Sequence, residues 1–150
     1  MENLDIILKE IKKDFFRYRN GVVAESLSKL YPKGKLVFGL NVPQLMEISN
    51  KVPKDLDLAL SLWKDKNCRE SRLLSMYLFP TSLLPKDVAS DLIKDVDSME
   101  EAEFLAFRVL RHLSYANDLY IEFQGDDYLS SQAKYCVEML KRNLEQLNPL

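Results

Sequence analysis

Apolar residues recur at intervals of three or four positions along most of this chain, which is the pattern of amphipathic helices with one buried face. The first helix is predicted from Leu4 to Tyr18, because this spacing continues up to the stop signal Asn20-Gly21. The same spacing predicts further helices over residues 22–31, 41–52, 56–63, 73–78, 85–93, 98–110 and 127–147. No segment reads as a convincing strand. The pattern therefore predicts an all-α fold.

Two of the predicted helices begin with strong local signals. Asn41 is followed three positions later by Gln44, with a proline between them in the first turn. Ser98 is followed three positions later by Glu101, which is the pattern of a capping box. We therefore expect helices to begin directly after Asn41 and Ser98.

Composition agrees with one compact helical domain over residues 1–150. The chain is 47% apolar and has only four glycines, so it can bury a core and has few glycine-dependent turns. No apolar run approaches the ~20 residues of a membrane span, and the N-terminus lacks the features of a secretion signal. We therefore expect no membrane span and a cytoplasmic location. Cys68 and Cys136 form no C-x-x-C pair, so both are predicted to be reduced packing residues.

A weak internal repeat adds to this description. The segments Leu62–Asp65 and Leu92–Asp95 match at an offset of thirty, each after a short amphipathic helix and before a second apolar one. Stacked helix pairs of this kind form α-solenoids, in which one concave face is lined by every second helix. An irregular helical bundle is the alternative.

Charge is close to balanced overall but uneven along the chain. There are 21 Lys and Arg against 23 Asp and Glu, so the net charge is −2. Residues 1–35 contain eight basic residues against five acids, whereas residues 86–103 contain two against seven. A surface that binds nucleic acid therefore has to be local.

Three short motifs follow one another in the first half of the chain. They read VFGLNVPQL from Val37, LALSLWK from Leu58 and RESRLLS from Arg69. In order and spacing they resemble the DNA alkylation repair family, whose members are HEAT-like helical-repeat DNA glycosylases. The matched segments run from about residue 24 to residue 113.

The resemblance implies antiparallel helix pairs whose concave, basic surface holds duplex DNA. It also implies excision of cationic alkylated purines, without a metal or another cofactor. In that reaction a carboxylate stabilises the positive charge that develops on the sugar and orients water, while aromatic side chains attract the cationic base.

The family's active pattern, a Trp followed four residues later by an Asp, falls on Met99 and Glu103 in this chain. Glu keeps the charge but places it about one methylene further from the backbone, and Met has no π face. We therefore expect a catalytically degenerate relative, with Glu103 as the candidate catalytic residue. The alternative for Glu103 is a solvated helix face beside Glu100 and Glu101, whose negative charges would repel DNA phosphate.

Basic side chains near two helix ends are the candidates for contacts with DNA phosphate. They are Lys64, Lys66, Arg69, Arg72, Arg108 and Arg111. The alternative is ordinary surface charge, paired with Asp65 and Glu70 near the first site or neutralising the acidic stretch before the second.

Two conspicuous side chains are assigned structural roles. Trp63 follows apolar residues on a helix face, so we expect it to anchor the core. His112 is the only histidine and has no neighbouring Cys, Ser or Asp motif, so we expect neither a catalytic triad nor a metal site. The aromatic-rich segment 115–128 is predicted to cover the end of the helical array.

The sequence thus predicts a HEAT-like α-solenoid related to the DNA alkylation repair glycosylases, with duplex DNA as its partner in a concave basic groove. The competing hypothesis is a helical-repeat scaffold that binds a protein partner and does not touch DNA. An exposed apolar end face would make a homodimer reasonable.

Overall fold

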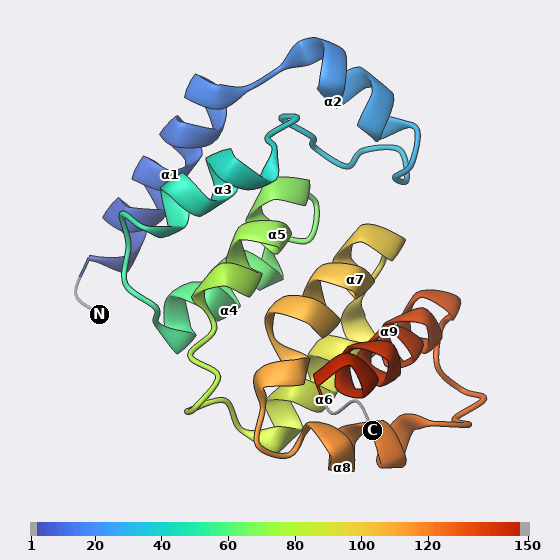
Figure 1. Ribbon diagram of the computed structural model, residues 1–150. Coiled ribbons are helices and arrows are strands. Elements are labelled where there is room, and N and C mark those ends of the chain that lie inside the picture. The colour runs from blue at the N-terminus through green and yellow to red at the C-terminus, as the bar shows by residue number, and fades with distance from the viewer. Residues whose placement is uncertain (1–2, 148–150) are drawn as a thin grey trace. The chain divides into compact units, whose positions relative to one another are not determined.

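The computed structural model describes residues 3–147, which form nine α-helices and one 3₁₀ turn (Figure 1). The all-α prediction is confirmed. Residues 3–147 contain no strand, and their β-type pairing is an isolated bridge between Leu36 and Cys68. The structure divides into two compact units, of which unit 1 ends at Phe79 and unit 2 begins at Pro80.

Unit 1 contains the first five helices. They are α1 (Leu4–Tyr18), α2 (Gly21–Ser28), α3 (Val42–Ser49), α4 (Leu56–Lys64) and α5 (Arg69–Leu78). The predicted capping box at the start of α3 is confirmed, because Asn41 Oδ1 accepts from Gln44 N at 2.9 Å and Gln44 Oε1 accepts from Asn41 N at 3.0 Å. Helix α4 is capped by Asp55, whose Oδ2 accepts from Leu58 N at 2.9 Å.

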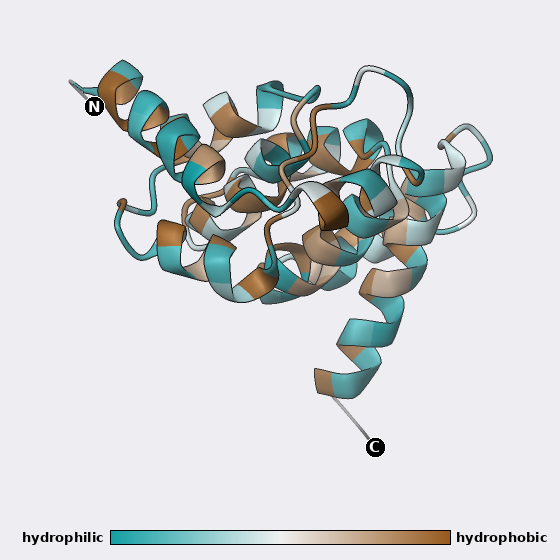
Figure 2. Cartoon of the chain, turned by 90° about the horizontal axis from the view of Figure 1, so that it is seen from above, coloured by the Kyte–Doolittle hydropathy of each residue, from teal (hydrophilic) through white to brown (hydrophobic). Residues whose placement is uncertain are grey.

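The core of unit 1 lies around α5. Helix α5 packs against α4 and α3, and α1 contacts α3 and α4. The loop before α3 contributes Phe38, whose ring lies 5.7 Å from that of Phe15 and 4.9 Å from that of Phe16. Trp63 is buried, as predicted. In Figure 2, hydrophobic (brown) and hydrophilic (teal) residues are interspersed along α1, the helix that starts at the N label.

Unit 2 contains the remaining elements. They are α6 (Lys86–Asp95), α7 (Met99–Arg108), the 3₁₀ turn η1 (Leu110–His112), α8 (Ala116–Phe123) and α9 (Ser131–Leu147). Ser98 caps α7, because its Oγ accepts from Glu101 N at 3.1 Å. The Glu101 carboxylate accepts from Asp97 N at 3.3 Å, one residue before the position that a capping box would use. Part of the aromatic segment predicted as a cover forms α8.

The core of unit 2 is centred on the contact between α7 and α9, with α6 and α8 also packed against α9. Both cysteines are free and buried, as predicted, and burial raises the pKa of the Cys136 thiol to about 12. None of the helices in residues 3–147 is both long and apolar enough to cross a membrane.

Candidate nucleic-acid interface

Two of the predicted DNA contacts, Lys64 at the end of α4 and Lys66 in the turn between α4 and α5, are exposed. This turn is tied to the loop before α3, because Leu36 N donates to Asn67 O at 2.6 Å. The neighbouring Lys35 donates its Nζ to the backbone carbonyl of Lys66. Three lysines from two distant segments are thus gathered, and we call Lys35, Lys64 and Lys66 the lysine turn.

The acid inside this turn, Asp65, is engaged by other residues of unit 1. Lys12 Nζ lies 2.6 Å from Asp65 Oδ2, and Ser71 Oγ donates to the same oxygen at 2.7 Å. Burial alone would raise the pKa of Asp65, but the hydrogen bonds from Lys12 and Ser71, with the charges of Lys12 and Lys35, hold it below its usual value. The carboxylate is therefore ionised and balanced by Lys12, which leaves the lysine turn positive.

Arg69 and Arg72, also predicted as phosphate contacts, are buried. They are only 5% and 1% exposed. The Arg69 guanidinium pairs with Glu70 at 2.5 Å, and that of Arg72 stacks over the Trp63 ring with 3.9 Å to the centroid. A guanidinium in this position does not reach a phosphate in solvent, so both arginines leave the set of candidate DNA contacts.

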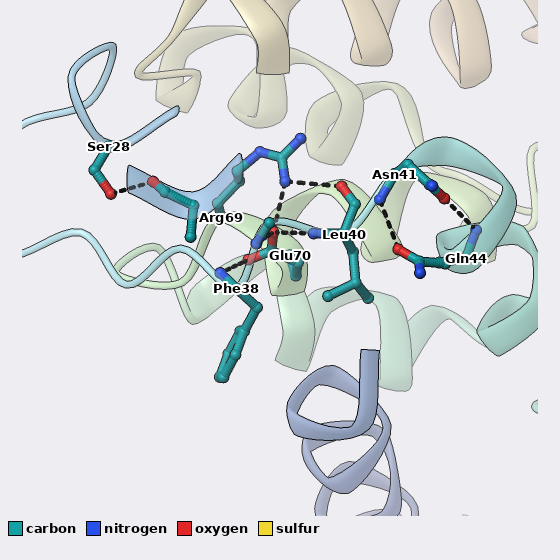
Figure 3. Close-up of polar contacts among 9 residues, drawn as sticks. Ser28, Phe38, Leu40, Asn41, Gln44, Arg69 and Glu70 are labelled. Carbon is teal, nitrogen blue, oxygen red and sulfur yellow. Dashed lines mark hydrogen bonds and ion pairs between the residues drawn. The ribbon is translucent and has the colours of Figure 1, made fainter. Parts of the chain in front are cut away.

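Glu70 fixes the loop that leads into α3 (Figure 3). Its carboxylate is fully buried and accepts from three consecutive backbone N–H groups, those of Phe38 at 2.9 Å, Gly39 at 3.0 Å and Leu40 at 3.3 Å. Arg69 Nη1 also donates to the carbonyl of Leu40 at 3.1 Å. Glu70 thus binds both Arg69 and the backbone of residues 38–40, which follow Lys35 of the lysine turn.

Gly39 is required in this loop for two reasons. Its φ is +86°, in the left-handed region that favours glycine. A Cβ at this position would lie 2.6 Å from Asn20 O and 2.9 Å from Ala24 N. The loop can therefore approach the start of α2 this closely only without a side chain.

In unit 2, α7 presents three side chains at intervals of four residues. Met99 is 53% exposed, Glu103 is exposed and Phe107 is 44% exposed. The hydroxyl of Tyr135 on α9 donates to Glu103 Oε1, and this hydrogen bond raises the pKa of Tyr135. On α7, Glu103 therefore has the ring of Phe107 one turn after it and the side chain of Met99 one turn before it.

The remaining predicted DNA contacts, Arg108 and Arg111, converge on Phe107. The Cζ atom of Arg111 lies 3.8 Å from the ring centroid and that of Arg108 lies 5.7 Å from it. Arg111 Nε also donates to His112 Nε2 at 3.4 Å. The ring of Phe107 thus already holds a cation on its face.

The two units differ strongly in charge. Unit 1 has 14 Lys and Arg against 10 Asp and Glu, a net of +4, whereas unit 2 has 7 against 13, a net of −6. The lysine turn belongs to the positive unit, and Glu103, Arg108 and Arg111 belong to the negative one. Among the residues that the structure describes, no group of His, Cys, Asp and Glu side chains could hold a metal ion.

Sequence reasoning did not assign a role to Lys35, Phe107 or Tyr135. The spacing of four residues between Glu103 and Phe107 on one helix is a signal that could have indicated Phe107. Lys35 and Tyr135 reach the site through contacts between residues 31 and 32 positions apart, for which the local sequence has no signal.

Comparison with family models, with curated proteins and with solved structures finds no significant match to this chain. Its function is therefore inferred from its own side chains.

Proposed function

We propose that this protein binds duplex DNA through the backbone phosphates, with the lysine turn as its contact surface, and that it does not excise bases. The observation that carries the proposal is the gathering of Lys35, Lys64 and Lys66 in a unit of net charge +4, with Asp65 balanced internally by Lys12. Lysines that neutralise phosphates release condensed counterions, which drives binding without regard to base sequence.

The proposal includes a relationship to the DNA alkylation repair family and its HEAT-like helix pairs. The three motifs that carry the resemblance contact one another in unit 1. Glu70 of the third motif binds Phe38 of the first, and Arg72 of the third stacks on Trp63 of the second. The residues that carry the resemblance therefore pack together in unit 1, which supports the proposed relationship.

The surroundings of Glu103 support the absence of excision. Its carboxylate accepts a hydrogen bond from Tyr135, and Met99 has no π face for a cationic base. The aromatic ring one turn after Glu103 on α7, that of Phe107, is covered by Arg111. A cationic base at this ring would meet a positive guanidinium where the reaction needs an attractive surface.

Titration of a labelled duplex at several salt concentrations tests the binding proposal. Three phosphate contacts predict a slope of about −3 for the logarithm of affinity against the logarithm of salt concentration. The variant Lys64→Gln/Lys66→Gln is expected to reduce the size of the slope by about 2. The matched control, Lys134→Gln/Lys141→Gln in unit 2, leaves it unchanged. Equal losses in both variants, or binding that ignores salt, would refute the proposal.

The absence of excision has its own assay, which is the release of methylated purine from alkylated duplex DNA. We expect no release above the rate without protein. Release that disappears in Glu103→Gln would show that Glu103 is catalytic. That result would leave the proposed DNA binding intact.

A helical scaffold for a protein partner is the second candidate function. It is favoured by the exposed apolar side chains of Met99 and Phe107 on α7, because aromatic and Met side chains beside arginines are enriched in protein interfaces. A duplex titration that shows no binding at low salt would favour this candidate over the first.

A further inference from the structure

Helix α2 is apolar but has no buried side chain. Val22 is 79% exposed and Val23 is 39% exposed, and Leu30, just beyond the helix, is 75% exposed. The helix is held to unit 1 mainly through its first residues. Asn20 caps it, with Oδ1 accepting from Val23 N at 3.1 Å, and the backbone of Ala24 lies against the loop at Gly39.

A helix of this length needs packing to be stable. Isolated helices shorter than about 12 residues are marginal in water, and α2 has eight. Neighbouring apolar side chains that remain in solvent on such a helix mark an interaction surface. The surface lies on α2 itself, and does not include the lysine turn.

The arrangement of side chains around α2 defines this surface. Since successive residues are about 100° apart around a helix, Val22, Val23 and Ser26 lie on one exposed side of α2. Leu30 continues this mainly apolar strip just beyond the helix end, whereas Leu27 is half-buried. Residues 25 and 29 lie along one edge of the strip, four positions apart. They are Glu25 and Lys29, both exposed, and neither has an ion-pair partner within the part of the chain that the structure describes.

We propose that α2 is a homodimer contact, in which two copies of this chain pack their α2 helices antiparallel about a two-fold axis. In such an antiparallel pair, an edge of one helix lies beside the same edge of the other helix, and the two sequences run in opposite directions. Glu25 then faces Lys29 of the partner subunit, and the symmetry repeats this pair. The two apolar strips cover each other between the pairs.

The charge pattern identifies a second copy as the partner. A surface complementary to this edge must present a cation opposite Glu25 and an anion opposite Lys29. In an antiparallel second copy, the same edge presents Lys29 opposite Glu25 and Glu25 opposite Lys29. The surface is therefore complementary to itself. The proposal does not depend on the proposed DNA binding, and its test contains no DNA.

The contact is small, which limits its strength. Eight residues span only about 12 Å, so two such helices bury less than the roughly 1,200 Å² of a stable interface. We therefore expect a weak dimer, with a Kd between about 1 µM and 1 mM.

Sedimentation equilibrium of the full chain over that concentration range measures the association. The weight-average mass is expected to rise from 17.5 kDa toward twice that value. Leu30→Ser removes apolar area from the strip and is expected to weaken the dimer about tenfold. Because Leu30 is exposed, the fold is retained, and a thermal melt of the variant verifies this. A mass that stays at that of one chain throughout the series would overturn the proposal.

Charge reversal tests the antiparallel geometry. Glu25→Lys and Lys29→Glu each place like charges opposite each other, so each variant alone is expected to dimerise roughly fivefold or more weakly. An equal mixture of the two variants is expected to form heterodimers, because every facing pair is then complementary. Glu138→Lys on α9 is the matched control, since Glu138 pairs with Arg142 at the same spacing, and it leaves association unchanged. Failure of the mixture to associate would refute the geometry.

Discussion

Replacing Glu70 by Gln is expected to be among the most destabilising single changes in unit 1. The carboxylate is fully buried, accepts from three backbone N–H groups and pairs with Arg69 at 2.5 Å. Gln has nearly the same shape, but only one of its two terminal atoms is an acceptor. Its NH₂ group would face N–H donors and the Arg69 guanidinium, and the guanidinium would lose its counter-charge.

The magnitude follows from the loss of a buried pair. Hydrogen bonds to a charged group contribute about 1.5–3 kcal/mol each, and breaking a buried ion pair by removing one partner costs about 3–5 kcal/mol. Because the contributions overlap, we expect the free energy of unfolding to fall by about 3–5 kcal/mol. This is a large fraction of the roughly 5–15 kcal/mol of a typical domain.

Urea denaturation at neutral pH, followed by circular dichroism, measures this loss. Glu138→Gln is the control, because Glu138 is exposed on α9 and its replacement should change the free energy by less than about 0.5 kcal/mol. The double variant Arg69→Met/Glu70→Gln is expected to recover part of the loss, since it removes the uncompensated charge. A loss below about 1 kcal/mol for Glu70→Gln would show that the carboxylate does not organise the loop.

Three further predictions concern other residues. The folded pKa of Asp65 is lowered, so its contribution to stability is present above the unfolded pKa of about 3.9 and is lost as the pH falls through the folded pKa. At pH 7, urea denaturation of Asp65→Asn should therefore give a free energy of unfolding below that of the wild type by less than about 1 kcal/mol, because the Asp65 side chain is 39% exposed and that of its partner Lys12 is 38% exposed. In acid the two free energies should converge. Gly39→Ala should lower the free energy of unfolding more than Gly34→Ala, since both glycines have positive φ but only Gly39 is crowded by backbone atoms. Cys136 should react with a thiol reagent only in denaturant, because it is fully buried and its pKa is about 12; labelling of the native protein that can be traced to Cys136 by mass spectrometry would contradict this.

The sequence was informative where a local pattern determines structure. The spacing of apolar residues located α1, and the Asn41 and Ser98 caps located the starts of α3 and α7. These features depend on residues within four positions of one another. Local hydrogen bonds and helical periodicity are therefore sufficient to predict them.

The burial of Arg69 and Arg72 could not be predicted in this way. An amphipathic helix is expected to place its charged residues in solvent, but every residue of α5 from Arg69 to Met76 is buried. The charges are accommodated by Glu70 and by the face of Trp63, and the loop over Glu70 comes from thirty positions earlier. Contacts over such distances in sequence decide the environment of this helix.

The two units carry net charges of opposite sign, although the net charge of the whole chain is only −2. At about 0.1 M salt the Debye length is about 10 Å, shorter than the width of either unit, so charges more than this distance apart are largely screened from one another. The isoelectric point of about 5.5 suggests that only an anion-exchange resin would retain the protein at neutral pH. With +4 on one unit and −6 on the other, resins of both signs should retain it at about 0.1 M salt, where this screening applies.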